Sequence, residues 1–171
     1  MKNKWPDAVI GVIYDSSDAY SAGIVDGFLT KATELGLNVA VDDAAFTADN
    51  KADLSTQVNL CKDAGCDLVF LPFYYTEAAQ VLTYANTVGY KPTFFGCDGM
   101  DGILNVEGFD TSLAEGLVLM TRVTLKLLNH LGIKKSLVSY YEHNKATQGS
   151  RIVERILAGE TCALVSDAGS P

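Results

Sequence analysis

The middle of the chain contains the run Cys66-Asp67-Leu68-Val69-Phe70-Leu71-Pro72-Phe73, which is apolar at almost every position. The run has the length of a β-strand and is too short for a typical helix. A strand with one solvated face alternates apolar and polar residues, whereas this run stays apolar at consecutive positions. The run therefore predicts a strand that is buried on both faces, as in a parallel sheet covered by helices on two sides.

The same alternation of strand and helix extends outward from this run in both directions. Ala8–Tyr14 is a second apolar run, and the polar residues Asp15–Asp18 after it can each cap a helix. Apolar residues then recur every three or four positions from Ala19 to Leu35, which predicts an amphipathic helix ending at Gly36. The other expected strands are 37–44, 92–97, 115–121, 136–142 and 162–166, and the other expected helices are 50–64, 76–89, 122–131 and 147–158.

This alternation places the chain in the α/β class. We expect a three-layer α/β/α sandwich with a mainly parallel, doubly wound sheet of about seven strands, flavodoxin-like or Rossmann-like. The 171 residues fit a single domain, because domains average about 150 residues. We therefore expect one α/β domain over residues 1–171.

Composition excludes several classes of function. The net charge of −8 disfavours nucleic-acid binding, which needs clustered positive charge. No apolar stretch reaches the ~18 residues of a membrane helix, and residues 1–6 lack the apolar region of a signal peptide. The cysteines Cys61, Cys66, Cys97 and Cys162 show no metal-ligand spacing, which favours free buried thiols in a reducing compartment. These features lead us to expect a cytoplasmic protein without a membrane or nucleic-acid partner.

Ligands of doubly wound sheets lie at the carboxyl ends of the strands. Carboxylates and tyrosines gather there in this sequence, and together they can bind an ammonium group by ion pairing and cation–π contact. The alternative is that the Asp and Ser residues only cap helices and turns. The pair Asp42-Asp43 lacks a matching Asp after the third strand, and glycine-rich phosphate loops are absent. We therefore expect no metal, no cofactor and no catalytic residue.

Residues from about 7 to 120 resemble the second lobe of branched-chain amino-acid binding proteins, the extracytoplasmic receptors of ABC transporters (periplasmic-binding-protein-like I fold). The motifs that carry the resemblance are Ile13–Gly23, Asp67–Tyr75, Phe94–Gly99 and Phe109–Thr121. It implies the strand order 2-1-3-4-5. In that family the ligand is clamped between two lobes, and the first lobe has no counterpart here.

The same resemblance implies a ligand site. The family's tyrosine after the first strand falls on Tyr20, and its tyrosine after the third strand falls on Tyr74 or its neighbour Tyr75. Its acidic residue that holds the amino group falls on Asp98. We therefore expect Tyr20, Tyr74, Tyr75 and Asp98 to form a half-site that contacts only the amino end of a small amino acid.

Residues from about 121 to 171 resemble a different family, the ribosomal-RNA ribose 2′-O-methyltransferases of the tetrapyrrole-methylase superfamily. The matching motifs are Thr121–Ile133, Tyr140–Asn144 and Leu164–Pro171. The first strand and the C-terminal domain of that family, which help to form the S-adenosylmethionine cleft, have no counterpart in this sequence. Methyl transfer needs that cleft to position donor and acceptor.

The two resemblances meet near Met120-Thr121, at the end of an expected strand. This arrangement leads us to expect an engineered chimera of residues 1–120 and 121–171 with no selected biochemical activity. One alternative is weak binding of a branched-chain or other small amino acid, with an affinity no better than about millimolar. A second alternative is an S-adenosylmethionine-dependent rRNA methyltransferase, which would need a complete cofactor cleft and a basic RNA-binding face.

The join also raises a problem of strand order. In the methyltransferase family the strand replaced here is interior, whereas the fifth strand of the receptor lobe lies at the sheet edge. The last strand must then move outward, displace another strand or pair with another chain. We therefore expect a homodimer, formed through an exposed edge strand or a swapped C-terminal segment.

Overall fold

The computed structural model describes residues 1, 3–119 and 145–161, and for 145–148 it describes the backbone only. The chain divides into two compact units, Met1–Met120 and Thr121–Pro171. The boundary falls at the position where the two sequence resemblances meet. Whether the two units form the single domain expected from the sequence stays a prediction.

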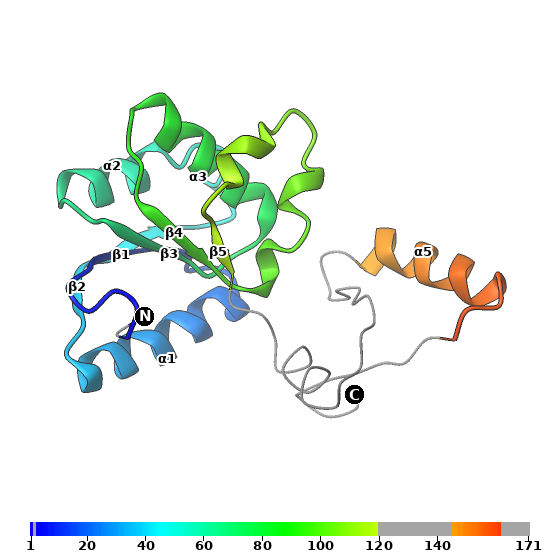
Figure 1. Ribbon diagram of the computed structural model, residues 1–171, viewed down its shortest axis with the longest axis horizontal. Coiled ribbons are helices and arrows are strands. Elements are labelled where there is room, and N and C mark those ends of the chain that lie inside the picture. Colours follow the sequence, from blue (N-terminus) through cyan, green and yellow to red (C-terminus); the bar gives the residue numbers. More distant parts are fainter. Residues whose placement is uncertain (2, 120–144, 162–171) are drawn as a thin grey trace. The chain divides into compact units, whose positions relative to one another are not determined.

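The described strands form one parallel sheet (Figure 1). Its order is β2-β1-β3-β4-β5, which confirms the expected α/β class and the order 2-1-3-4-5. The strands expected at 136–142 and 162–166, and the helix expected at 122–131, lie outside the described residues. The strands are β1 (Val9–Asp15), β2 (Asn38–Phe46), β3 (Leu68–Leu71), β4 (Thr93–Gly96) and β5 (Val118–Leu119).

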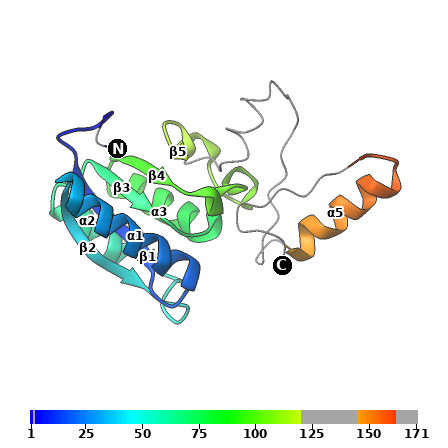
Figure 2. The same ribbon diagram turned by 90° about the horizontal axis from the view of Figure 1, so that it is seen from below.

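Helices cover both faces of this sheet. Helix α1 (Ala19–Leu35) lies on one face, and α2 (Ser55–Asp63) and α3 (Tyr75–Thr87) lie on the other (Figure 1). Figure 2, seen from below, shows α1 in front of the strands. Three short 3-10 turns follow β4, namely η1 (Asp98–Met100), η2 (Ile103–Asn105) and η3 (Thr111–Ala114). The three-layer sandwich expected from the sequence is therefore confirmed.

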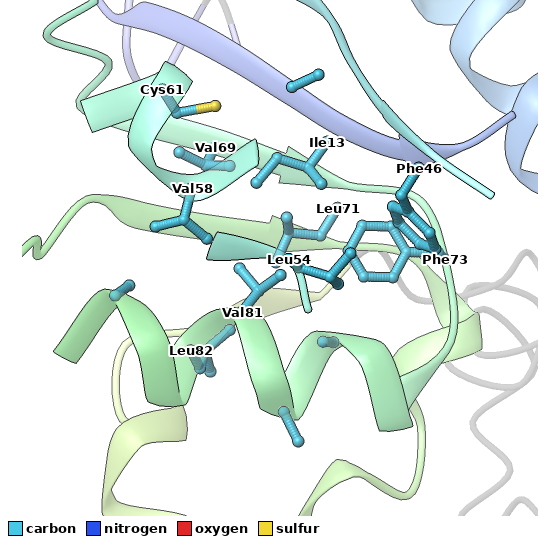
Figure 3. Close-up of a cluster of buried hydrophobic side chains, with 14 of the residues drawn as sticks. Ile13, Phe46, Leu54, Val58, Cys61, Val69, Leu71, Phe73, Val81 and Leu82 are labelled. Carbon is cyan, nitrogen blue, oxygen red and sulfur yellow. The ribbon is translucent and has the colours of Figure 1, made fainter. Parts of the chain in front are cut away.

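Strand β3 is buried on both faces, as its continuous apolar run predicts. Leu68 and Phe70 belong to the cluster packed against α1, where the ring of Phe28 lies 4.8 Å from that of Phe70. Val69 and Leu71 belong to the larger cluster beneath α2 and α3 (Figure 3). Burying each of these side chains stabilises the folded state by about 1.5–3 kcal/mol. Because its side chains lie in both clusters, the central strand β3 connects the two halves of the core.

Local signals explain most element boundaries. The carboxylate of Asp18 accepts a hydrogen bond from the Ser21 amide and caps α1, and Gly36 ends that helix at φ 61°. Helix α2 begins at Ser55 rather than at the expected residue 50. The reason is that the side chain of Asn50 closes a turn by accepting the amide of Thr47 at 2.7 Å, which diverts residues 47–50 from the helix.

Strand β2 ends two residues later than the expected range 37–44, at Phe46. Asp42 and Asp43 lie within the strand and are exposed. Phe46 is buried and its ring meets that of Phe73 edge to face at 5.1 Å, which explains why the strand extends this far.

Helix α5 (Lys145–Leu157) corresponds to the helix expected at 147–158. Its residues Val153, Ile156 and Leu157 recur at helical spacing on one side, and their exposed fractions are 54%, 50% and 81%. The Arg155 Nη2 lies 2.6 Å from Glu160 Oε2, just beyond the helix end. Among the helices of the described part of the chain, none has the length and apolar character needed to cross a membrane.

Candidate functional site

The carboxyl ends of β1, β3 and β4 meet at one edge of the sheet, because the three strands are parallel neighbours. Strand β1 ends at Asp15 and leads into the first turn of α1. Strand β3 leads to Tyr74, and β4 leads to Asp98. The fold therefore collects, at this edge, side chains that are far apart in the sequence.

Tyr20 and Asp98 are joined by a hydrogen bond. The phenol of Tyr20 donates to Asp98 Oδ1 at 2.8 Å, although the two residues lie 78 positions apart. The same phenol oxygen accepts a hydrogen bond from the amide of Gly99 at 3.2 Å. Asp18 holds Tyr20 in place indirectly, because it caps the first turn of α1 in which Tyr20 lies.

Tyr74 completes this cluster through its ring. The rings of Tyr20 and Tyr74 stack with their centroids 5.3 Å apart and their planes 21° apart. A Cβ atom on Gly99 would lie 2.9 Å from the Phe73 carbonyl oxygen and 3.2 Å from Tyr74 Cδ1. A glycine is needed at this position, because any side chain would push the loops after β3 and β4 apart. The structure thus brings together three of the four residues that the resemblance grouped, Tyr20, Tyr74 and Asp98.

Tyr75, the alternative to Tyr74 in the expected half-site, contacts a different part of the fold. Its ring packs beside Gly102, where a Cβ atom would lie 3.6–3.9 Å from three of its ring carbons. It also packs against the buried cluster beneath α2 and α3. Successive residues at the start of α3 point in different directions, so only one of the two tyrosines stacks on Tyr20. Tyr74 therefore stacks on Tyr20, whereas the contacts of Tyr75 are with Gly102 and the buried cluster. Which tyrosine contributes to a half-site stays a prediction.

Burial and negative charge keep both phenols of the cluster protonated. Burial, followed by the hydrogen bond to Asp98, raises the pKa of Tyr20 well above its ordinary value. Burial raises the pKa of Tyr74 to about 12, and the charges of nearby Asp18 and Asp98 add to the shift. At neutral pH the two side chains are therefore neutral aromatic hydrogen-bond donors beside carboxylates.

A lysine also reaches this edge, and the sequence analysis did not single it out. Lys51 Nζ donates to Glu77 Oε1 at 2.9 Å, and Glu77 lies in the first turn of α3 and is buried. The hydrogen bond to Glu77, helped by the charge of Asp15, raises the pKa of Lys51. One available signal was that Lys51 follows the carboxyl end of the second strand, as ligand-contacting residues of this fold do.

The described cysteines are not suited to nucleophilic chemistry. Cys61, Cys66 and Cys97 are free and buried, as the sequence predicted, whereas Cys162 lies outside the described residues. Burial raises the pKa of Cys61 and of Cys97 to about 12. These thiols are protonated at neutral pH, and the thiolate is the reactive form.

A hollow of about 480 Å³ is lined by other residues than those of this cluster. It is formed by the start of α2, the outer side of α3 and the segment Val106–Phe109. None of Tyr20, Tyr74 and Asp98 lines it. The candidate site is therefore the tyrosine–aspartate cluster, which has the residue types that hold an ammonium group.

No protein-family model matches the chain. Among curated proteins, a 51-residue segment is 59% identical to ribosomal RNA small subunit methyltransferase I from Halalkalibacterium halodurans, covering 30% of this chain and 18% of that protein. The corresponding Bacillus subtilis methyltransferase is 51% identical over the same length and share. The chain thus spans about a fifth of the length of these relatives. The unit Thr121–Pro171 also has 51 residues.

Solved structures give a different likeness. The leucine binding protein LivK from Thermotoga maritima superposes with a TM-score of 0.62 at 21% identity, covering 93% of this chain and 40% of that one. A type 1 periplasmic binding protein from Bordetella pertussis superposes with a TM-score of 0.59 at 16% identity, covering 69% of this chain and 31% of that one. At these identities the likeness shows the fold. The two kinds of similarity, to a methyltransferase segment and to binding-protein structures, fit a chimeric chain.

Proposed function

We propose that this chain is an engineered chimera with no selected biochemical activity. The observation that carries the proposal is that two unrelated similarities, each to a minor part of a longer protein, occur in one chain. The structure divides into two units at Met120-Thr121, where the sequence resemblances meet. The segment that matches the methyltransferases corresponds to about a fifth of their length, so by itself it supplies at most part of the surface that positions cofactor and substrate.

Methyl transfer is the activity to test first. The purified chain is incubated with labelled S-adenosylmethionine and small-subunit ribosomal RNA, and label retained with the RNA is counted on filters. The full-length Bacillus subtilis methyltransferase serves as the positive control. We expect no label above background from this chain. Transfer that rises with the concentration of the chain would overturn the proposal.

A second candidate function is weak binding of a branched-chain or other small amino acid. The contacts between Tyr20, Tyr74 and Asp98 favour it, because an ammonium group can pair with the carboxylate and lie against the aromatic faces. One lobe contacts only part of the ligand, which leaves the rest in water. We therefore expect an affinity no better than about millimolar, near −4 kcal/mol.

A nuclear magnetic resonance titration with leucine tests this binding. Amide shifts of residues around Asp98 should move saturably with leucine in the parent chain and in Asp101→Ala, a matched control that removes an exposed aspartate three residues away. They should not move in Asp98→Ala. If the parent shows no saturable shift while its spectrum is that of a folded protein, the second candidate function is wrong.

Self-association and location also stay proposals. Within the described residues β5 is an edge strand of only two residues, and Leu119 on it is 39% exposed. We propose a homodimer that forms through this edge, and a cytoplasmic location supported by the free buried thiols. Light scattering should show a mass that rises toward the dimer with concentration, and Leu119→Lys should abolish the rise. A strictly monomeric parent chain would contradict the dimer.

A further inference from the structure

Two buried thiols meet beneath the end of α2. Cys61 lies in the last turn of that helix and Cys66 lies just before β3, and both belong to the cluster beneath α2 and α3 (Figure 3). A Cβ atom on Gly11 of β1 would lie 2.6 Å from Cys61 Sγ and 3.1 Å from Cys66 Sγ. The two thiols also share a hydrogen bond. Their sulfur atoms are therefore neighbours, in the space that the glycine leaves open.

The backbone at the end of α2 explains why the two side chains meet. The Cys66 amide donates to the Cys61 carbonyl at 3.0 Å. The Gly65 amide donates to the Lys62 carbonyl at 3.0 Å, and Gly65 has a φ of 71°, in the left-handed region. This pattern is the Schellman motif, in which the two residues joined by the longer hydrogen bond commonly make an apolar side-chain contact. Here two cysteines make that contact.

Cys97 provides a comparison within the same chain. It is 1% exposed, and burial raises its pKa to about 12, as it does for Cys61. Cys97 belongs to the cluster packed against α1, whereas Cys61 and Cys66 belong to the cluster on the other face of the sheet. The chain therefore offers an equally buried thiol that the sheet separates from the pair.

We propose that Cys61 and Cys66 are a reversible dithiol–disulfide site, which links the end of α2 to the start of β3 when the chain meets a low-molecular-weight disulfide such as oxidised glutathione. The thiolate of one cysteine attacks a glutathione sulfur, and one glutathione leaves as a thiolate. The thiolate of the other cysteine then attacks the protein sulfur of the mixed disulfide and releases the second glutathione. The protein loses two electrons and two protons, and oxidised glutathione becomes two molecules of the reduced thiol.

Burial makes this exchange slow. Cys61 is 0% exposed and Cys66 is 2% exposed, and burial raises the pKa of both thiols. Because the thiolate is the reactive form, the exchange has to pass through a local opening at the end of α2. We therefore expect oxidation over minutes to hours, which suits a structural cross-link and not a catalytic thiol. In a reducing compartment the pair stays reduced.

Peptide mapping locates the cross-link. The folded chain is equilibrated with oxidised glutathione, the remaining thiols are alkylated, and trypsin then cuts after Lys62, which lies between the two cysteines. The peptide that carries Cys61 should stay linked to the peptide that carries Cys66 until a reductant is added. Cys97→Ala is the matched control and should give the same linked peptides. Cys61→Ala and Cys66→Ala should each give none.

A second measurement asks whether the fold itself favours the link, because two cysteines this close in sequence also pair in an unfolded chain. The glutathione ratio at half oxidation is measured for the folded chain and for the chain in urea. We expect the disulfide to be at least about tenfold more stable in the folded chain, and the oxidised chain to unfold at a higher urea concentration than the reduced chain. Gly11→Ala places a methyl group against both sulfur atoms and should reduce this preference, whereas Gly23→Ala, with nothing within 4 Å, should not.

The outcomes decide the proposal in either direction. A link between Cys61 and Cys66 that the folded chain forms more readily than the unfolded chain supports it. Mixed disulfides with glutathione alone, a link to another cysteine, or free thiols at equilibrium in a folded chain overturn it. A link that forms equally well in urea also overturns it, because the fold would then not hold the two thiols in position to react.

Discussion

Strand β3 and helix α5 differ in where their apolar side chains lie. All four residues of β3 are buried, two in each half of the core. On α5, Val153, Ile156 and Leu157 are each at least half exposed. The comparison teaches that a buried apolar run lies inside the layered core of residues 1–120, whereas the apolar side chains described on α5 are exposed.

The two units also differ in charge. Residues 1–120 have a formal charge of −11, from 17 acidic residues and six lysines, whereas residues 121–171 have +3, from four acidic and seven basic residues. The unequal charge bears on function, because the acidic unit holds the candidate ammonium site. The basic unit contains seven of the thirteen lysine and arginine residues of the chain and none of the described residues of that site.

The largest expected effect comes from truncating the core of the first unit. Phe73 is 1% exposed and meets the ring of Phe46 edge to face. Phe73→Ala should lower the free energy of unfolding by about 3–5 kcal/mol, measured by urea denaturation. Leu157→Ala on α5 is the matched control, and a cost below ~0.5 kcal/mol is expected at that exposed position. Equal losses of unfolding free energy in Phe73→Ala and Leu157→Ala would contradict the difference described between β3 and α5.

Alkaline pH should destabilise the first unit next most strongly. The described groups with raised pKa all lie in residues 1–120, among them Cys61, Tyr74 and Cys97, each raised to about 12. Their ordinary values are 9.0 for the thiols and 10.0 for the phenol, so above pH 9 the unfolded chain loses these protons first. The contribution of these groups to the free energy of unfolding is fully present below about pH 9, where they are protonated in both states. It is lost as the pH rises toward 12. Urea unfolding at a series of pH values measures how the free energy of unfolding changes with pH. A free energy of unfolding that stays constant from pH 8 to 11 would contradict this prediction.

A glycine substitution tests the close packing of the candidate site. Gly99→Ala places a methyl group 2.9 Å from the Phe73 carbonyl oxygen, a backbone atom that cannot turn away. We expect a loss of about 1–3 kcal/mol in the free energy of unfolding, and loss of any leucine-dependent shift. Gly23→Ala on α1, where nothing lies within 4 Å, should instead stabilise the chain by about 0.5–1 kcal/mol. Loss of stability in both variants would show that helix packing, and not the site, was disturbed.

The smallest expected effect concerns the cap that positions Tyr20. Asp18→Ala removes the acceptor of the Ser21 amide and should cost about 1 kcal/mol. Asp18→Asn, whose side chain caps a helix equally well, should lower the free energy of unfolding by only a few tenths of a kcal/mol. Thermal unfolding followed by circular dichroism compares the two. If Asp18→Asn and Asp18→Ala lower the stability of the chain equally, the charge of Asp18 matters more than its capping hydrogen bond.

Much of the first unit could be predicted from the sequence, because its signals are local and agree with one another. The apolar runs predicted the strands, and the capping candidates Asp15–Asp18 together with Gly36 predicted the first helix and its end. Tyr20, Tyr74 and Asp98 could be placed together, because parallel neighbouring strands end at one edge. The resemblance to binding proteins supplied the particular residues.

Other features depend on tertiary contacts that no local pattern reports. The Lys51–Glu77 pair joins the segment after β2 to the first turn of α3, 26 residues further along the chain, and nothing in either segment indicates the other. Tyr75 could not be separated from Tyr74, because the direction of each side chain depends on where α3 begins. The extension of β2 from the expected end at residue 44 to Phe46 depends on the buried ring of Phe46, which was not part of the expected strand.

Hydrogen exchange of the full chain, read by mass spectrometry, tests the central claim that the stable core lies in residues 1–120. Amides of β1, β3 and β4 should exchange only through global unfolding. Amides of α5, a 13-residue helix with an exposed apolar side, should exchange at least about tenfold faster through a smaller opening. Equal protection of β3 and α5 would contradict the claim and would support the single domain over residues 1–171 that the sequence predicts.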